Sequence, residues 1–243
     1  MNAWFALPAL ALIAGVLALT PLGSQVLRRG VVFIDLAVAQ AAAAAVIATH
    51  ALMPTESLLQ DQLAATLGAV LVSLLIAALA RRWPAQREAL IGLLYVAGAC
   101  LALLGASAHP HGRDKLLQLL AADVLWVDAV SVLGLCLAAA LVWALQRQQR
   151  LMRDSWFYAA FAVVASVAVP ALGLFLVFAS LIAPALWIEK GLRPALAMAA
   201  TGAASLLGLA ASWWLDTPSG PSVVLALALL GLGAVVAQGR GTH

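Results

Sequence analysis

The chain has 243 residues, of which 65% are apolar and only 9% are charged. Soluble domains average about 45–50% apolar and about 25% charged residues, and they need that polarity to cover their surface. This composition excludes a soluble enzyme, a disordered segment and a nucleic-acid-binding domain. The net charge of +3 fits the Lys and Arg that membrane proteins concentrate in cytoplasmic loops. We therefore predict a chain that is embedded in lipid.

The apolar segments predict an all-α fold, in which residues 1–243 form a single polytopic transmembrane bundle of about nine spans. Each span needs about 20 apolar residues. The segment 155–188 is too long for one span, and Pro170 and Gly173 divide it into two short ones that meet near 169–173, because proline removes a helix hydrogen bond. The other predicted spans are 4–20, 31–52, 63–80, 89–108, 124–145, 194–215 and 222–238.

The basic residues predict the orientation of this bundle. With nine spans and the N-terminus outside, only Arg113 and Lys115 of the 13 Lys and Arg residues face outward, and the C-terminus lies inside. This is the bias that the positive-inside rule describes. Because no Lys or Arg precedes Arg28, the first segment is predicted to be a span and not a cleaved signal peptide. Residues 116–127 are predicted to form an amphipathic helix at the outer interface.

Asp35 is the ionisable residue that stands out within a predicted span. Such residues are costly in lipid and indicate function by default. Two interpretations stay open: the side chain reaches the cytoplasmic edge or pairs with Arg28 or Arg29, or it is the carboxylate of a transport path or metal site. At helical spacing Ala39 shares the face of Asp35, whereas Gln40 lies about 140° away.

Other possible metal ligands lie in the predicted outward-facing loops. Imidazole and carboxylate groups suit divalent transition metals. His109 and His111 are the most suggestive pair, although a solvated loop is the alternative, and His50 and Asp216 complete this possible outer contact set. No metalloprotease, P-loop or serine hydrolase motif occurs, so no catalytic residue is predicted.

Small and aromatic residues predict packing and not chemistry. The alanine tract 41–45 gives a smooth helix face that a neighbouring helix can approach closely. Trp143 is assigned, with the other tryptophans near span ends, to the interfacial aromatic belt. Cys100 and Cys136 are predicted to be small buried hydrophobic residues.

Four stretches resemble the permeases of the zinc/manganese class of ABC importers, and DTPSGPSVVLALALL is the most specific of them. Their order and spacing agree with that family, and together they frame nearly the whole chain. They are PLGSQVLRRGVVFIDLAVAQ (21–40), LLQLLAADVLWV (116–127), GLFLVFASLIAPAL (173–186) and DTPSGPSVVLALALL (216–230).

The resemblance implies a permease subunit of the bacterial inner membrane, homodimeric or paired, that is not itself an enzyme. A cytoplasmic ABC ATPase would hydrolyse ATP, and a periplasmic substrate-binding protein would deliver Zn²⁺ or Mn²⁺. The ion would be cargo and not a permanently bound cofactor, and it would pass between the helices by alternating access. Lipid surrounds such a subunit, and no nucleic acid partner is expected.

The proposed metal path departs from the family pattern at two positions that hold histidines in the family's zinc members. In the span 89–108, Tyr95 and Val96 occupy the region of one of them. In the family a histidine follows the second-span aspartate by four residues, whereas here Ala39 takes that position beside Gln40. Asp35 is therefore the expected metal ligand, and a carboxylate with an amide suits Zn²⁺ less well than one with imidazole. Two alternatives stay open: a permease of the same fold for another small solute or a metal chelate, and a non-transporting membrane partner that lost the path histidines.

The cytoplasmic loop 146–154 is shorter than its counterpart in the family. Its basic residues Arg147, Arg150 and Arg153 are the expected ATPase-coupling residues. The alternatives are coupling through 81–88 or 189–193, or a coupling that differs from that of the family.

Overall fold

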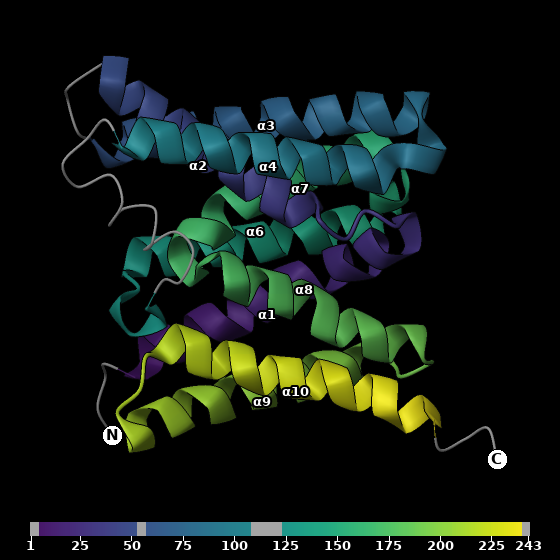
Figure 1. Cartoon of the computed structure of the whole chain (residues 1–243). Coiled ribbons are helices and arrows are strands. Elements are labelled where there is room, and N and C mark those ends of the chain that lie inside the picture. Colours follow the sequence, from purple (N-terminus) through teal and green to yellow (C-terminus); the bar gives the residue numbers. More distant parts are fainter. Residues whose placement is uncertain (1–4, 53–56, 108–122, 240–243) are drawn as a thin grey trace.

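The computed structural model describes residues 5–52, 57–107 and 123–239, and in these residues every regular element is a helix (Figure 1). Three of them are short 3-10 helices, η2 (Pro84–Gln86), η3 (Val124–Trp126) and η4 (Arg150–Met152). The α-helices are α1 (Ala6–Arg29), α2 (Ile34–Leu52), α3 (Leu58–Arg82), α4 (Arg87–Ser107), α6 (Ala129–Arg147), α7 (Asp154–Leu172), α8 (Leu174–Glu189), α9 (Pro194–Leu215) and α10 (Ser219–Gly239).

Seven of the described helices are long and apolar enough to cross a membrane, and α2 and α8 contribute shorter apolar segments. Each predicted span thus has a helix in the structure. The predicted all-α class and the multi-pass membrane character are confirmed, while the number of spans and their orientation stay predictions. Cys100 and Cys136 are exposed on α4 and α6, so their predicted burial is wrong. An apolar segment does not distinguish the interior of a membrane bundle from its lipid-facing surface, because both are apolar.

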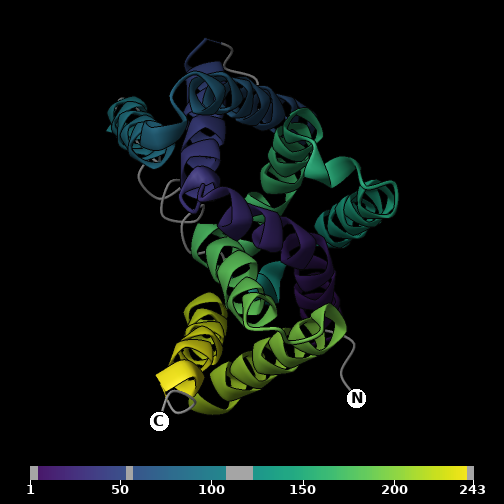
Figure 2. The same ribbon diagram turned by 90° about the vertical axis from the view of Figure 1, so that its right-hand side faces the viewer.

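The helices form three groups, and two views at right angles agree on their order. Helices α2, α3 and α4 lie on one side, α9 and α10 lie on the opposite side, and α1, α6, α7 and α8 lie between them (Figures 1 and 2). About two thirds of the membrane-spanning windows of α1 and α7 is buried (67%), against 11% for α4. The core therefore lies around α1 and α7, and α4 is at the rim.

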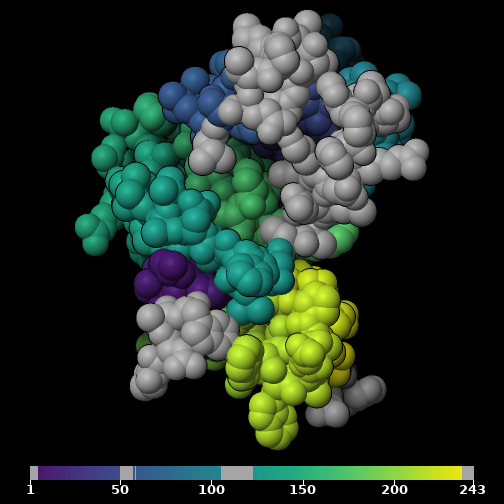
Figure 3. Space-filling view, turned by 90° about the vertical axis from the view of Figure 1, so that its left-hand side faces the viewer, coloured from purple at the N-terminus to yellow at the C-terminus, as the bar shows by residue number. Residues whose placement is uncertain are grey.

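The segment that leads into α6 packs against the start of α10 at one end of the bundle. In Figure 3 this teal segment lies directly above the yellow-green ends of α9 and α10. The hydroxyl of Ser219, at the start of α10, donates to the carboxylate of Asp123. Val124–Trp126 form a 3-10 turn, and Asp128 caps α6 by accepting from the Ser131 backbone N–H at 3.1 Å. The predicted span 124–145 thus begins at Ala129, and residues 116–122 of the predicted interfacial helix lie outside the described residues.

The first predicted span ends too early. The predicted span stops at residue 20, but α1 continues through Pro21 to Arg29 and ends at Gly30, whose φ is 59°. Proline has no N–H to bond the carbonyl four residues before it, that of Leu17. The indole Nε1 of Trp143 donates to this carbonyl at 3.2 Å. Trp143 therefore has a specific partner within the bundle, and its place in the interfacial belt stays a prediction.

We expect Trp143→Phe to lower the free energy of unfolding by about 1 kcal/mol, because a carbonyl in an apolar setting loses its partner. The same substitution should cost less in a Pro21→Ala background, in which the backbone N–H at position 21 can bond Leu17 within the helix. A double-mutant cycle in denaturant unfolding measures this coupling. Equal costs in the two backgrounds would contradict this explanation of the continuous helix.

The division of 155–188 into two helices is confirmed. Helix α7 runs through Pro170 to Leu172, and α8 starts after Gly173, whose φ of 81° suits glycine. The break therefore comes from the glycine and not from the proline. Pro170 frees the carbonyl of Ser166, which accepts a hydrogen bond from Nε2 of Gln62 in α3 at 3.2 Å. At both Pro21 and Pro170, a side chain from a neighbouring helix thus donates the hydrogen bond that the proline cannot make.

Candidate functional site

Three segments that are far apart in the sequence meet at the end of the bundle where α1 ends. They are the α1–α2 turn, the start of α4 and the segment that leads into α7. Val32 donates its backbone N–H to Oε1 of Glu88 at 3.1 Å, and Nε of Arg29 lies 3.1 Å from Oδ1 of Asp154. The ends of α1, α3 and α6 also carry basic residues. This gathering of positive charge matches the predicted cytoplasmic side, which stays a prediction.

Asp35 lies in the first turn of α2 next to this end and is completely buried, with 0% exposure. Neither of its carboxylate oxygens has a hydrogen-bond partner in the part of the chain that the structure describes. The interpretation in which Asp35 reaches the membrane edge or pairs with Arg28 or Arg29 is therefore wrong, and Arg29 instead pairs with Asp154. A buried carboxylate without a partner is costly, and such groups in membrane helices mark functional paths by default.

The neighbours of α2 define the direction in which Asp35 faces. A Cβ at Gly68 of α3 would lie 2.7 Å from the Ala41 carbonyl oxygen, and a Cβ at Gly98 of α4 would lie 3.2 Å from Cβ of Gln40. Helices α3 and α4 therefore cover the flanks of α2 that carry these residues. The Asp35 face is about 120–140° from both flanks at 100° per residue, and it points into the bundle, where α2 also contacts α7 and α8.

This arrangement separates the three residues predicted for the transport path. Ala39 lies on the interior face with Asp35 and is buried, whereas Gln40 is buried against α4. The structure thus brings Ala39 and Asp35 to one face and does not bring Gln40 to it. The close contact at Gly68 agrees with the packing role predicted for the alanine tract.

The predicted outer metal contacts are not assembled in the described residues. His109 and His111 lie outside them, and His50 lies in the last turn of α2, about 22 Å from Asp35 at 1.5 Å per residue. Asp216 is exposed at the end of α9, with a left-handed φ of 51°. Within residues 5–52, 57–107 and 123–239, no group of three or more His, Cys, Asp and Glu side chains could hold a metal ion.

The short connection between α6 and α7 presents the three predicted coupling residues on its surface. Arg147 is the last residue of α6, Arg150 is the first residue of η4, and Arg153 follows η4. All three are exposed. The guanidinium of Arg150 lies 4.8 Å from the centroid of the Trp156 ring. Leu151, which is completely buried, anchors the segment to the bundle. The loop is therefore a fixed basic surface.

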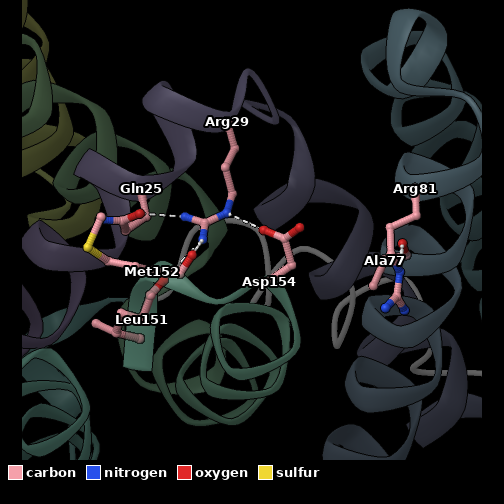
Figure 4. A network of polar contacts seen from close by, with 7 residues as sticks. All are labelled: Gln25, Arg29, Ala77, Arg81, Leu151, Met152 and Asp154. Carbon is pink, nitrogen blue, oxygen red and sulfur yellow. Dashed lines mark hydrogen bonds and ion pairs between the residues drawn. The ribbon is translucent and has the colours of Figure 1, made fainter. Parts of the chain in front are cut away.

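Sequence reasoning did not find the residues that hold this loop to the rest of the bundle. Arg29 bonds Asp154 and the carbonyls of Leu151 and Met152 across separations of 122–125 residues (Figure 4). Glu88 likewise bonds Val32 across 56 residues. A pattern among residues that are close together in the sequence cannot predict such contacts. The only signal in the sequence was the presence of charged residues at the predicted ends of spans.

Comparisons with known proteins support the resemblance that was drawn from the sequence. Residues 148–238 match the model of a family described as the ABC 3 transport family. PsaBC from Streptococcus pneumoniae, solved in complex with a Fab, is similar to this chain, with a TM-score of 0.75 and 17% sequence identity over 96% of this chain and 91% of that chain. No curated protein sequence matches the chain. The resemblance is thus confirmed in sequence over 148–238, and the fold is shared with PsaBC over nearly the whole chain.

Proposed function

We propose that this chain is the transmembrane permease subunit of an ATP-driven ABC importer for a divalent metal ion. The observation that carries the proposal is the fully buried carboxylate of Asp35, which has no hydrogen-bond partner in the described residues and faces the interior of the bundle. Two free carboxylate oxygens can replace water molecules that a cation loses when it leaves bulk solvent. The match of residues 148–238 to the ABC 3 transport family supports the transporter class.

The residues around Asp35 favour a hard ion as cargo. Ala39 occupies the position one helical turn further along the interior face, so no imidazole from that position joins the carboxylate. Carboxylate oxygen suits Mn²⁺, whereas Zn²⁺ prefers nitrogen and sulfur ligands. We therefore place Mn²⁺ ahead of Zn²⁺. The same observation keeps one other candidate, a permease of this fold for another small solute or a metal chelate.

The permease would work with partners that hydrolyse ATP and deliver the ion. A cytoplasmic ATPase would dock on Arg147, Arg150 and Arg153, and ATP binding would shift the bundle between inward-open and outward-open states. A periplasmic binding protein would present the ion at the opposite end, and a second permease subunit, in a homodimer, would complete the pathway. The permease itself would catalyse no reaction.

The test is reconstitution of the permease with the ATPase that copurifies with it, followed by uptake of radiolabelled Mn²⁺ and Zn²⁺ into vesicles. We expect ATP-dependent uptake, with Mn²⁺ faster than Zn²⁺. Failure of any ATPase to copurify from cells that express its neighbouring genes would contradict the proposal. If a small solute, and neither ion, stimulates ATP hydrolysis by the reconstituted complex, the second candidate is favoured.

The proposed role of residues 146–154 as the ATPase-docking loop can be tested separately. The double variant R150E/R153E should lose the copurifying ATPase, because it reverses two charges on the exposed loop. The matched control is K190E/R193E, which reverses two charges on the exposed α8–α9 turn and should retain the ATPase. If the control loses the ATPase and R150E/R153E retains it, the ATPase docks on the α8–α9 turn instead.

A further inference from the structure

Arg29 makes the most extensive polar network at the proposed cytoplasmic end (Figure 4). Its Nε lies 3.1 Å from Oδ1 of Asp154, and its Nη2 donates to the carbonyl oxygens of Leu151 at 3.1 Å and Met152 at 3.0 Å. Its Nη1 donates to the side-chain oxygen of Gln25, one turn earlier in α1. Its guanidinium carbon is 4.3 Å from the centroid of the Phe157 ring. Most of these partners belong to η4 and the start of α7.

Only arginine can make this set of contacts. A guanidinium has five N–H donors in a rigid plane, so it can bond a carboxylate, two carbonyls and an amide at once while its face lies on an aromatic ring. The Arg29 side chain is 13% exposed, but that of its ion-pair partner Asp154 is 57% exposed. Solvent therefore screens the ion pair, while the bonds to Gln25 and to the Leu151 carbonyl are partly buried and less screened. Arg29 therefore holds the last turn of α1 to the loop that presents Arg150 and Arg153.

The chain that follows Arg29 is a tight turn that leads into α2. Gly30 bonds back to Leu27 and Val31 bonds back to Val26, and Ile34 then bonds to Val31 at 3.1 Å. Arg29 and the start of α2 can move little relative to each other, because only the five residues 30–34 separate Arg29 from Asp35 and they form this hydrogen-bonded turn. A displacement of the 150–154 segment that moves Arg29 must therefore move the start of α2.

A second contact holds the same turn to the rim of the bundle. Glu88 of α4 accepts from the Val32 backbone N–H, and a Cβ at Gly30 would lie 3.1 Å from Nη2 of Arg87. The turn is thus held between α4 on one side and the α6–α7 connection on the other. Motion of the connection relative to α4 acts directly on the segment that carries Asp35.

We infer that Arg29 is a positioning residue that couples the ATPase-docking loop to the transport carboxylate through the α1–α2 turn. This inference rests on the proposed function. Arg81 provides the contrast, because its Nε donates to the carbonyl of Ala77 in its own helix (Figure 4). Arg81 lies at the same end of the bundle and carries the same charge, but this bond does not join two segments.

The first arm of the test uses hydrogen exchange of the purified permease in lipid nanodiscs. Arg29→Lys keeps the positive charge but cannot bond all of these partners at once. We expect faster amide exchange in two separate segments, 148–153 and 31–37, and no change in either segment for the matched control Arg81→Lys. Faster exchange in 148–153 alone, with 31–37 unchanged, would overturn the link.

The second arm uses vesicles that contain the permease, its copurifying ATPase and Mn²⁺. We expect Arg29→Lys to retain the ATPase and its ATP hydrolysis while Mn²⁺ uptake per ATP falls about tenfold, within the 5–150-fold range of typical coupling. Uptake per ATP equal to that of the unmodified protein would overturn the inference. Asp154→Asn should act in the same direction and serves if Arg29→Lys does not yield a monodisperse protein.

A charge swap separates this role from a simple ion pair. In the double variant R29D/D154R, opposite charges still face each other, but an aspartate cannot donate to the carbonyls of Leu151 and Met152. We expect the swap not to restore uptake per ATP, and full restoration would overturn the inference. If the unmodified complex shows no uptake, the proposed function fails, while the exchange arm still reports whether Arg29 links the two segments.

Discussion

Replacement of Asp35 by asparagine should abolish metal uptake and at the same time make the protein harder to unfold. The side chain is completely buried and its two oxygens have no partner among the described residues. Removing a buried charge without a partner relieves a desolvation penalty. Asparagine has nearly the same shape, so the substitution leaves no cavity.

The expected magnitudes are large in both measurements. Uptake of Mn²⁺ should fall below about one hundredth of its original rate, because loss of a ligand should exceed the 10–100-fold effect of a supporting residue. The free energy of unfolding should rise by about 1–3 kcal/mol, because burying a carboxylate costs more than burying a neutral amide, even though the amide is also left without partners. Vesicle uptake and denaturant unfolding of the same preparation check the two effects together.

Asp128 supplies the matched control. It is an exposed carboxylate that caps α6, and hydrogen bonding from Ser131 lowers its pKa. Asparagine is an equally good N-cap, so Asp128→Asn should change neither uptake nor stability appreciably. If Asp35→Asn instead lowers stability and leaves uptake intact, the carboxylate is a structural group and the proposed transport path is wrong.

Gly23→Ala should disrupt the fold. A Cβ at Gly23 would lie 2.0 Å from the carbonyl oxygen of Leu181 and 2.8 Å from its carbonyl carbon. These are backbone atoms of α8, so they cannot move aside as a flexible side chain would. Because α1 packs along α8 at this point, the two helices would have to separate. We expect a loss of about 3 kcal/mol or more, at the upper end of overpacking effects.

Gly92 provides the control for the same substitution. It lies in α4, and nothing is within 4 Å of a Cβ placed there. Gly92→Ala should keep the fold and raise its stability by up to about 1 kcal/mol, since alanine is the better helix former. Size-exclusion chromatography and unfolding in detergent would compare the two variants. Similar behaviour of both would show that the α1–α8 contact has room for a side chain.

The sequence predicted the parts of the fold that depend on one segment at a time. Apolar segments of about 20 residues predicted a helix for each span. Gly173 indicated the break between α7 and α8, although Pro170 itself lies within α7, and the alanine tract of α2 indicated a close helix contact. In each case the residues that carry the signal are neighbours in the chain, so their pattern could be interpreted without a partner.

Other properties were decided by contacts between distant segments. The carbonyl of Leu17 finds its donor in Trp143, 126 residues away, and this partner lets α1 pass through Pro21. Arg29 pairs with Asp154 across 125 residues and not with Asp35, which has no partner among the described residues. The sequence singled out Asp35 but left two interpretations open, since its solvation and pairing depend on what surrounds it.

The residues alone thus determined that this protein is a helical membrane bundle with one exceptional carboxylate, because transfer into lipid depends on each side chain separately. Only the tertiary structure decided that Asp35 is buried and faces the bundle interior, and that Gln40 faces α4. It alone also showed that Arg29 joins the basic loop to the α1–α2 turn. These properties depend on how the helices cross and on contacts between segments distant in the chain, such as Gln40 against Gly98 and Arg29 with Asp154.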